Sequence, residues 1–427
     1  MKVAKNCRYV EPQFTLRFDK ETSEEIWDEA LDALGAGATY PTLYNDDVNV
    51  PAVMYGMRVD EKTAEQYVPF GCTEFVIQGQ STGTPNICIN LLKLLTIYMN
   101  DGIDPIDGKR KSGPVSLKKL EEYQTFEEFY DGYKALLDYY LDLSVKAQYH
   151  SYEVMNQHVS FLFTSLLTDD CIARGKALLD GGVRYLGGTN ETYGNINTSD
   201  SLWVIRDLVF NQKKYTLRQL NDAMLANFNG YEALRKDCLN CDKYGNDLET
   251  ADTMANDLYE FVAKGVRDRG IAIGMQYFLI VISNNQLNTE WGNRTAASPD
   301  GRLSCMYMNP ANNPQGGANK SGPTAMLNSL AKFDAKYHGG SVQNIKFSPS
   351  MFNENRAVIK SLFKTYFAKG GCHLMVTVVD KGVLEDAVEH PENYPDLIVR
   401  VSGFSAVFVD LSPNIQQELL SRVLYDK

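Results

Sequence analysis

The chain has 427 residues, of which 44% are hydrophobic and only 15 are prolines, a composition typical of a globular protein with a sizeable core. Its formal net charge is −12 at pH 7. Nucleic acids and anionic membrane surfaces attract basic proteins, so this charge argues against both as main partners and leaves small molecules and other proteins.

The N-terminal segment and the cysteines indicate where the protein works. Residues 1–14 contain no apolar run of the kind that a signal peptide needs, and the longest apolar stretch, residues 271–283, is too short to span a bilayer. Eight cysteines are scattered through a chain too large to depend on disulfide bonds, which fits a reducing compartment. We therefore expect a cytoplasmic protein.

Apolar periodicity predicts strands and helices that alternate along the chain. Residues 14–18 alternate as a strand, and a helix is expected from Ser23 to a stop at Gly35. Helices then dominate the middle of the chain and are predicted over residues 91–98, 126–147, 149–168, 217–226 and 251–266. Two segments rich in glycine and asparagine, residues 187–197 and 309–322, are expected to be loops.

Toward the C-terminus the pattern becomes more mixed. We expect a strand over residues 374–379, a short helix over residues 382–390, and a last helix that Ser412 caps and that runs to residue 424. No linker marks a domain boundary, so a mixed α/β architecture in one domain is the simplest prediction.

The segment Gly71-Cys72-Thr73-Glu74 is a candidate catalytic pair. On an extended backbone Cys72 and Glu74 point to the same side, so a thiol and a carboxylate would face one cavity. A neighbouring glutamate raises the pKa of a thiol and keeps it protonated, which suits transfer of a hydrogen atom better than nucleophilic attack. The alternative from these residues alone is a buried cysteine beside a surface glutamate.

Residues 399–410, VRVSGFSAVFVD, read as a strand that is interrupted at Ser402-Gly403. A glycine α-carbon lies between an amide nitrogen and a carbonyl group, which together delocalise an unpaired electron, and without a β-carbon it can become planar. An S–H bond is close in strength to such a Cα–H bond, so a radical can pass between the two. Gly403 and Cys72 can therefore work as a couple.

Metal ligands are not evident in the sequence. The five histidines lack ligand spacing, and Cys238-Leu239-Asn240-Cys241 is a lone pair of cysteines without a second pair. We predict no metal site and no bound organic cofactor.

The segment Arg400-Val401-Ser402-Gly403-Phe404-Ser405-Ala406 resembles the glycyl radical signature of the pyruvate formate-lyase-like family, and Gly71-Cys72-Thr73-Glu74 resembles that family's active-site Gly-Cys-x-Glu loop. Further blocks in family order include Lys243-Tyr244-Gly245-Asn246-Asp247 and Ser298-Pro299-Asp300-Gly301-Arg302. The resemblance implies an α/β barrel of strands surrounded by helices, in which the Cys72 and Gly403 loops meet. It places the barrel portion in residues 1–380 and a C-terminal glycyl radical domain in residues 381–427.

The resemblance also implies roles for residues and partners. Gly403 would store a radical installed by a separate iron–sulfur activating enzyme that uses S-adenosylmethionine, Cys72 would attack the substrate as a thiyl radical, and Glu74 would act as acid or base. The expected reaction is cleavage of a C–O, C–X or C–C bond of a small metabolite, as in dehydratases, other lyases or decarboxylases.

Departures from the family pattern narrow this expectation. Acyl transfer of the formate acetyltransferase type is disfavoured. Pyruvate formate-lyase itself resembles this loop but has two adjacent cysteines there, whereas residue 71 of this chain is glycine. Some polyol dehydratases carry two carboxylates where this chain reads Thr82-Gly83-Thr84-Pro85-Asn86, which argues against diol dehydration. Asn86 and Glu191 are the candidates for substrate binding.

Length is the largest departure, because family members usually carry a long N-terminal half that has no counterpart here. One alternative is a C-terminal portion that works only with a separate N-terminal partner. Another is a non-enzymatic repair protein that donates its glycyl loop, although retention of Cys72-Thr73-Glu74 argues against it. The resemblance is also consistent with a homodimer.

Overall fold

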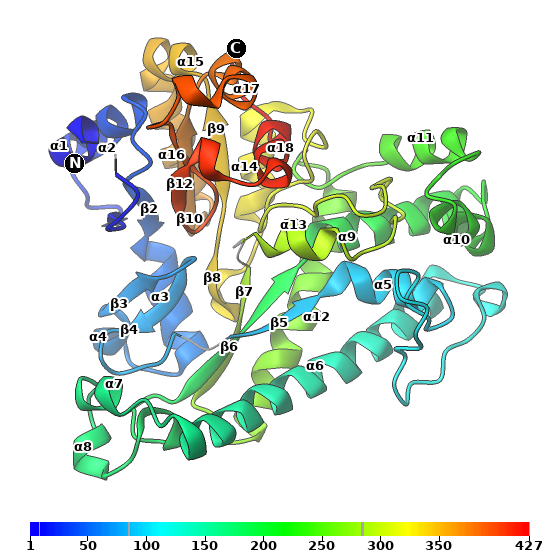
Figure 1. The fold of residues 1–427 in the computed structure, drawn as a ribbon, viewed down its shortest axis with the longest axis horizontal. Helices are drawn as coiled ribbons and strands as arrows, with labels where there is room; N and C mark the ends of the chain where they lie inside the picture. Colours follow the sequence, from blue (N-terminus) through cyan, green and yellow to red (C-terminus); the bar gives the residue numbers. More distant parts are fainter. Residues whose placement is uncertain (8, 84–85, 283–285, 427) are drawn as a thin grey trace.

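The computed structural model describes the chain except residues 8, 84–85, 283–285 and 427. Two four-stranded sheets and two short hairpins form its framework, and helices surround the sheets (Figure 1). The strands are β1 (Thr15–Phe18), β2 (Thr42–Asn45), β3 (Tyr67–Phe70), β4 (Glu74–Ile77), β5 (Asn86–Asn90), β6 (Gly187–Tyr193), β7 (Tyr277–Ile282), β8 (His338–Ser341), β9 (Asn344–Phe347), β10 (His373–Val378), β11 (Ile398–Arg400) and β12 (Ser405–Val407).

The helices vary widely in length. They are α1 (Lys2–Asn6), α2 (Glu24–Gly35), α3 (Asp46–Met57), α4 (Glu61–Ala64), α5 (Leu91–Met99), α6 (Phe126–His158), α7 (Leu162–Leu166), α8 (Cys171–Arg174), α9 (Asn195–Val204), α10 (Leu217–Leu225), α11 (Glu232–Asn240), α12 (Glu249–Ala272), α13 (Leu287–Gly292), α14 (Gly322–Ala331), α15 (Pro349–Glu354), α16 (Arg356–Ala368), α17 (Lys381–Glu389) and α18 (Pro413–Ser421).

The first sheet is parallel throughout and has the strand order β5-β6-β7-β8. Every residue of β6 and β7 is buried, as expected for a parallel sheet covered on both faces. The largest apolar cluster lies between this sheet and helices α5, α6, α9, α10 and α12. The sheet therefore forms a rigid wall from which β5 and β6 present polar side chains.

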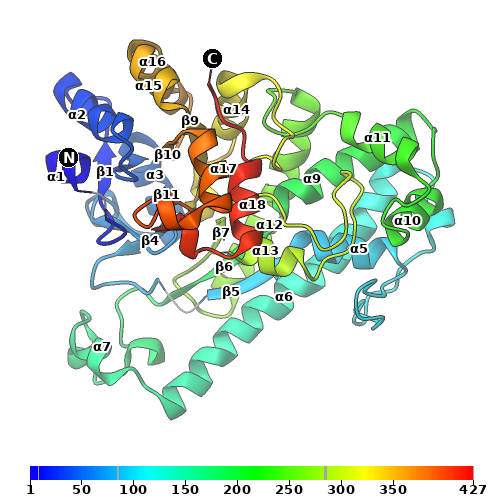
Figure 2. The same cartoon turned by 45° about the horizontal axis from the view of Figure 1, so that its top comes forward.

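The second sheet has the order β1-β2-β10-β9, and the chain passes directly from β8 to β9, so the two sheets are neighbours. A second apolar cluster joins this sheet to α2, α14 and α16. A smaller cluster is made only from residues between Val379 and Leu420 and packs α17 and α18 against β11. Figure 2 shows these C-terminal elements together, beside β10.

Residues 187–197, predicted to be a loop, instead form β6 and the start of α9, so this prediction was wrong. The glycines that suggested a loop serve packing: a β-carbon on Gly187 would lie 2.3 Å from the ring of Tyr277, and one on Gly188 would lie 2.6 Å from Phe278. Close approach of neighbouring side chains is a recognised reason for glycine inside a strand.

Residues 126–147 and 149–168 were predicted as two helices, but the first continues without a break to His158 as α6. Buried Val145, Gln148 and Tyr152 continue its inner face through the expected gap. The helix ends where Ser160 and Phe161 adopt left-handed backbone angles, with φ of 59° and 45°. The other helices and strands predicted above are present, with ends shifted by a few residues.

Within the part of the chain that the structure describes, no helix is both long enough and apolar enough to cross a bilayer.

Candidate active site

Cys72 lies in the turn of the β3–β4 hairpin, between Phe70 and Glu74. Gly71 and Thr73 have φ of 53° and 89°, so the turn is tight and the extended geometry expected from the sequence was wrong. A positive φ is costly for a β-branched residue such as Thr73, and such strain is often held at functional sites. The turn nevertheless brings the Glu74 carboxylate close to the residues before it, since a β-carbon built on Gly71 would lie 3.2 Å from Glu74 Oε2.

A half-buried ion pair fixes the hairpin to the rest of the fold. Arg17 on β1 donates to both carboxylate oxygens of Asp46 at 2.7–3.0 Å and to the carbonyl of Tyr67 at 2.8 Å. The Tyr67 hydroxyl donates to Asp46 at 2.6 Å, and the guanidinium of Arg17 lies 4.0 Å from the centre of the Tyr67 ring. Two-point pairing and ring stacking are geometrically specific, so the start of β3 has a fixed position.

Gly403 lies at the tip of the β11–β12 hairpin, where Arg400 pairs with Ser405. Gly403 is buried and contacts the cysteine turn directly: a β-carbon built on Gly403 would lie 2.3 Å from Cys72 Cα and 2.6 Å from Cys72 Sγ. The turn therefore leaves no room for a β-carbon at position 403. Because a C–C bond is about 1.5 Å long, the sulfur lies within about 4 Å of the Gly403 α-carbon. Gly403 and Cys72, which the sequence predicts to work as a radical couple, are thus in contact.

Burial controls the protonation of the site. Burial, together with the carboxylates of Glu74 and Glu191, raises the pKa of Cys72 to about 12, although Arg400 opposes the shift. Burial also raises the pKa of Glu74 to about 7, and the Glu191 carboxylate acts in the same direction. The thiol is therefore protonated at neutral pH, and Glu74 can both give and take a proton there. Glu74 is 4% exposed, so it is no surface glutamate.

Asn86 joins the two carboxylates. Its amide donates to Glu74 Oε1 at 3.1 Å and to Glu191 Oε1 at 2.8 Å, and its carbonyl accepts from Thr189. The Tyr193 hydroxyl donates to Glu191 Oε2. Asn86 on β5 pairs with Thr189 in the register of the adjacent parallel strand β6, which also carries Glu191, whereas Glu74 begins β4 of the cysteine hairpin. Thr84 and Pro85 of the stretch that precedes Asn86 lie outside the described residues.

Sequence reasoning missed one residue that touches both turns. The side-chain amide of Gln13 donates to the carbonyl of Gly403 at 3.0 Å and to that of Gly71 at 3.4 Å. An isolated glutamine before β1 carries no motif, so only the fold could reveal it. Among the described residues, no group of three or more histidine, cysteine or acidic side chains could hold a metal ion.

Comparison with known proteins agrees with this arrangement. The model of the protein family described as "Pyruvate formate lyase-like" matches residues 1–287. The model described as "Glycine radical" matches residues 308–409, which include Gly403. The chain belongs to the pyruvate formate lyase-like family.

Its similarity to individual members is moderate in sequence and strong in structure. The chain is 30% identical to the trans-4-hydroxy-L-proline dehydratase of Clostridioides difficile, over 98% of this chain and 53% of that protein. It is 26% identical to the 4-hydroxyphenylacetate decarboxylase glycyl radical subunit of Clostridioides difficile (strain CD196), over 100% of this chain and 52% of that protein. The glycerol-bound B12-independent glycerol dehydratase from Clostridium butyricum superposes with a TM-score of 0.91 at 29% identity, over 98% of this chain and 53% of that one.

The predicted fold class is confirmed, because a glycyl radical enzyme from Archaeoglobus fulgidus also superposes with a TM-score of 0.91 at 28% identity, over 99% of this chain and 54% of that one. The chain spans about half the length of the curated relatives that it matches.

Proposed function

We propose that the chain carries the radical residues of a glycyl radical lyase, with Gly403 as the radical store and Cys72 as the residue that attacks the substrate. Contact between Gly403 and Cys72 is the observation that supports this most strongly. A thiol held protonated beside a glycine α-carbon suits hydrogen-atom transfer, whereas a nucleophilic cysteine would need a depressed pKa. Residues 1–380 would be the barrel portion and residues 381–427 the glycyl radical domain.

Each proposed step conserves hydrogen atoms and electrons. A hydrogen atom moves from the Cys72 sulfur to the Gly403 α-carbon, which leaves the unpaired electron on sulfur. The sulfur then takes a hydrogen atom from a C–H bond of the substrate, the substrate radical loses its leaving group, and the S–H bond returns a hydrogen atom to the product radical. Glu74 protonates the leaving group or removes a proton from the substrate.

The substrate would be a small polar metabolite. The Asn86 amide donates to Glu74 Oε1 and to Glu191 Oε1 and so holds the two carboxylates side by side, while Glu74 Oε2 is buried and has no hydrogen-bond partner among the described residues. We propose that this oxygen, with Asn86 and Glu191 beside it, receives a hydroxyl or amine group of the substrate. Cleavage of a C–O or other C–X bond, or decarboxylation, agrees with relatives that are a dehydratase and a decarboxylase subunit.

The proposal includes a partner and a place in the cell. Family members rely on an iron–sulfur activating enzyme that uses S-adenosylmethionine, and we propose the same for Gly403. Such chemistry needs a reducing compartment, and we place the protein in the cytoplasm.

Electron paramagnetic resonance tests the proposal. Anaerobic incubation with an activating enzyme and S-adenosylmethionine should give an organic radical with a doublet signal in the native chain. Gly403→Ala should abolish the signal, whereas Gly382→Ala, a helical glycine whose added β-carbon meets only a side-chain oxygen of Asp380, should retain it. A doublet that persists in Gly403→Ala would overturn the assignment.

A further inference from the structure

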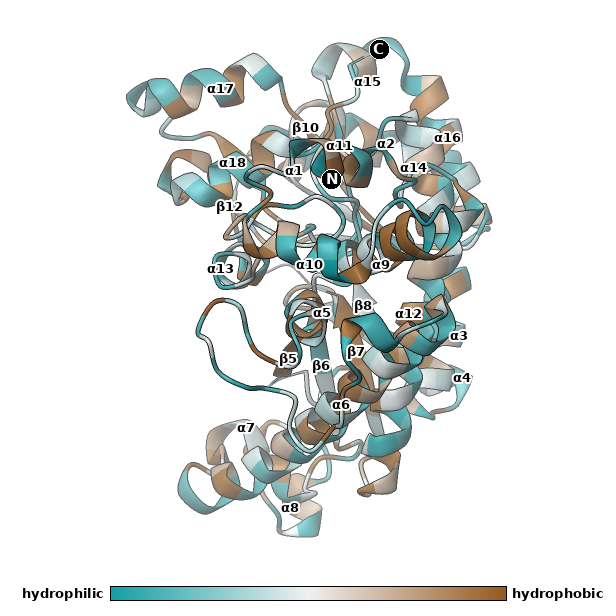
Figure 3. Cartoon of the chain, turned by 90° about the vertical axis from the view of Figure 1, so that its right-hand side faces the viewer, coloured by the Kyte–Doolittle hydropathy of each residue, from teal (hydrophilic) through white to brown (hydrophobic). Residues whose placement is uncertain are grey.

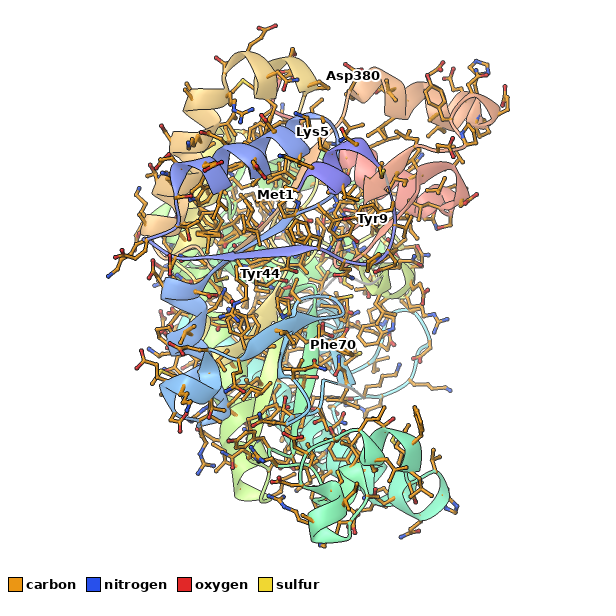
Figure 4. The ribbon with its side chains drawn as sticks, turned by 90° about the vertical axis from the view of Figure 1, so that its left-hand side faces the viewer. Met1, Lys5, Tyr9, Tyr44, Phe70 and Asp380 are labelled. Carbon is orange, nitrogen blue, oxygen red and sulfur yellow. The ribbon has the colours of Figure 1, made fainter. Side chains whose placement is uncertain are left out.

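A cavity of about 510 Å³ lies between α11, the turn that follows it and the loop of residues 309–322. Its volume is within the range of small-molecule sites, roughly 300–1,000 Å³. None of the residues assigned to the active site above is among its described lining residues. Figure 1 places α11 and the β3–β4 hairpin on opposite sides of the molecule; Figure 3 looks onto the side of α10 and α11, and Figure 4, drawn from the other side, shows Phe70 of the hairpin. The cavity is therefore separate from the proposed radical site.

Four basic side chains line this cavity, although the protein as a whole is acidic: Arg235, Lys243, Arg302 and Lys320. Within the part of the chain that the structure describes, none of the four forms an ion pair with a carboxylate. The chain has 54 acidic and 42 basic residues, so a group of cations without carboxylate partners is not expected from composition. Cations that converge in this way favour an anionic ligand.

Backbone carbonyls hold three of these cations in place without neutralising their charge. The guanidinium of Arg302 donates to three carbonyls at 2.5–3.1 Å, and the amine of Lys243 donates to two at 2.6 and 3.2 Å. Arg235 donates to the carbonyl of Gly301 at 2.9 Å. Burial lowers the pKa of Arg302 to about 10, so this side chain is still charged at neutral pH. Cations that are already ordered cost little to organise when a ligand binds.

Two buried side chains of the cavity wall each keep a polar atom without a hydrogen-bond partner among the described residues. Arg302 is 4% exposed and Asp200 is 1% exposed, and the atoms are Arg302 Nε and Asp200 Oδ2. Burial raises the pKa of Asp200 to about 7, although Lys243 opposes the shift, so at neutral pH a share of this carboxyl is protonated and can donate. Buried polar atoms without partners are rare in native proteins, and the oxygens of a bound anion would accept from both groups.

The other acidic side chains among the described lining residues are turned toward hydrogen-bond donors of the fold. Asp300 accepts from Ser298 and from Asn197, both at 2.6 Å. Asp242 accepts from the hydroxyl of Thr250 at 2.7 Å. Their carboxylates are therefore occupied elsewhere and leave the four cations of the cavity available to a ligand.

We propose that this cavity binds a small organic anion, a metabolite with a phosphate or carboxylate group, and that Arg235, Arg302 and Lys320 contact the anionic group. This is a second binding site, beyond the proposed radical reaction, and it does not depend on Gly403 or Cys72. The ligand would join α11 to the loop of residues 309–322. Because it binds the folded chain, it should also raise the melting temperature.

Titration calorimetry of the full chain at low salt tests the proposal with three probes. Glycerol 3-phosphate carries a phosphate group, citrate carries carboxylates, and glycerol is a neutral control. We expect at least one of the anions to bind with a dissociation constant below about 1 mM, and glycerol not to bind. Added sodium chloride should weaken the binding, because salt screens charges. The tighter of the two anions identifies the group that the cavity prefers.

A pair of variants locates the binding in the cavity. Arg235→Gln/Lys320→Gln should weaken binding of the anion at least about tenfold, because two charged donors are lost. Arg58→Gln/Lys62→Gln, at exposed positions at the end of α3 and in α4, removes the same charge outside the cavity and should leave the affinity unchanged. Thermal unfolding of each variant without ligand separates lost binding from lost folding.

Asp200→Asn should change the affinity in the opposite direction. At pH 8 most Asp200 side chains of the native chain are ionised, and removal of this negative charge should tighten binding of the anion about threefold or more. Damage to the fold would weaken binding instead, so tighter binding identifies an effect of charge. The proposal is overturned if neither anion binds, if glycerol binds as tightly as the anions, if the cavity variant binds as well as the control, or if Asp200→Asn binds more weakly at an unchanged melting temperature.

Discussion

Gly403 and Cys72, separated by 331 positions in the sequence, meet so closely that the β-carbon of an alanine at position 403 would lie 2.6 Å from the cysteine sulfur. The two hairpins are held in place by different contacts. The cysteine turn is anchored by Arg17 and Asp46, whereas the glycine hairpin packs in a small apolar cluster of its own near the C-terminus. Glycine at position 403 is required by this contact, because its φ does not lie in the left-handed region that favours glycine elsewhere.

Deuterium exchange tests this contact without knowledge of the substrate. The S–H hydrogen of Cys72 exchanges with solvent, so in D2O a hydrogen-atom exchange with the Gly403 radical would place deuterium on its α-carbon. The electron paramagnetic resonance doublet of the activated chain should then collapse to a singlet, because deuterium couples more weakly. Cys72→Ser should keep the radical and retain the doublet in D2O, whereas Cys305→Ser, at an exposed cysteine, should collapse like the native chain. Collapse in Cys72→Ser would show that another group exchanges with Gly403.

The raised pKa of Glu74 predicts a pH-dependent stability. Its pKa is about 7 in the folded chain and 4.5 for an ordinary glutamate, so the folded state binds more protons than the unfolded state between these values. The free energy of unfolding should therefore fall as pH rises from about 4.5 to 7, by on the order of 3 kcal/mol. Glu74→Gln removes this loss and should stabilise the chain at pH 8 more than at pH 5. Urea unfolding at both pH values measures the effect, with Glu65→Gln on the surface as control; an equal change at both pH values would contradict the assignment.

Asn86→Asp tests whether the amide separates the two carboxylates. The asparagine donates to both Glu74 and Glu191, and an aspartate would replace these donors with a third carboxylate. Like charges at such distances cannot all ionise, so the pKa of Glu74 should rise further, by about one unit or more. The decline of the free energy of unfolding with pH should move to higher pH by the same amount. Asn393→Asp, at an exposed position, should not move it, and an unmoved decline in Asn86→Asp would place the amide outside the network.

The sequence predicted the chemistry of this site better than its geometry. Cys72 and Gly403 could be paired because each type of residue has a distinctive radical chemistry, and their motifs lie in recognisable local context. The fold of residues 187–197 could not be read in the same way, because Gly187 and Gly188 resemble a loop until the rings of the next strand are placed beside them. Periodicity reports only local preferences, whereas strand β6 is stabilised by its neighbours β5 and β7.

Gln13 has no local signature at all, and its role depends wholly on the tertiary contact. Its amide donates to the carbonyls of Gly403 and Gly71, and so it ties the tip of the glycine hairpin to the cysteine turn. Gln13→Met keeps the length of the side chain but removes the donor. The glycine hairpin should then leave its buried position more often, which exposes Gly403 to the activating enzyme and separates it from Cys72. We expect radical formation to become faster and the collapse of the doublet in D2O to become slower, each by about three- to tenfold, the effect of losing one hydrogen bond of about 1 kcal/mol. Gln124→Met, at an exposed glutamine before α6, should change neither rate. A general loss of stability would not accelerate one rate while slowing the other, so opposite changes identify the tether, and parallel or absent changes would refute it.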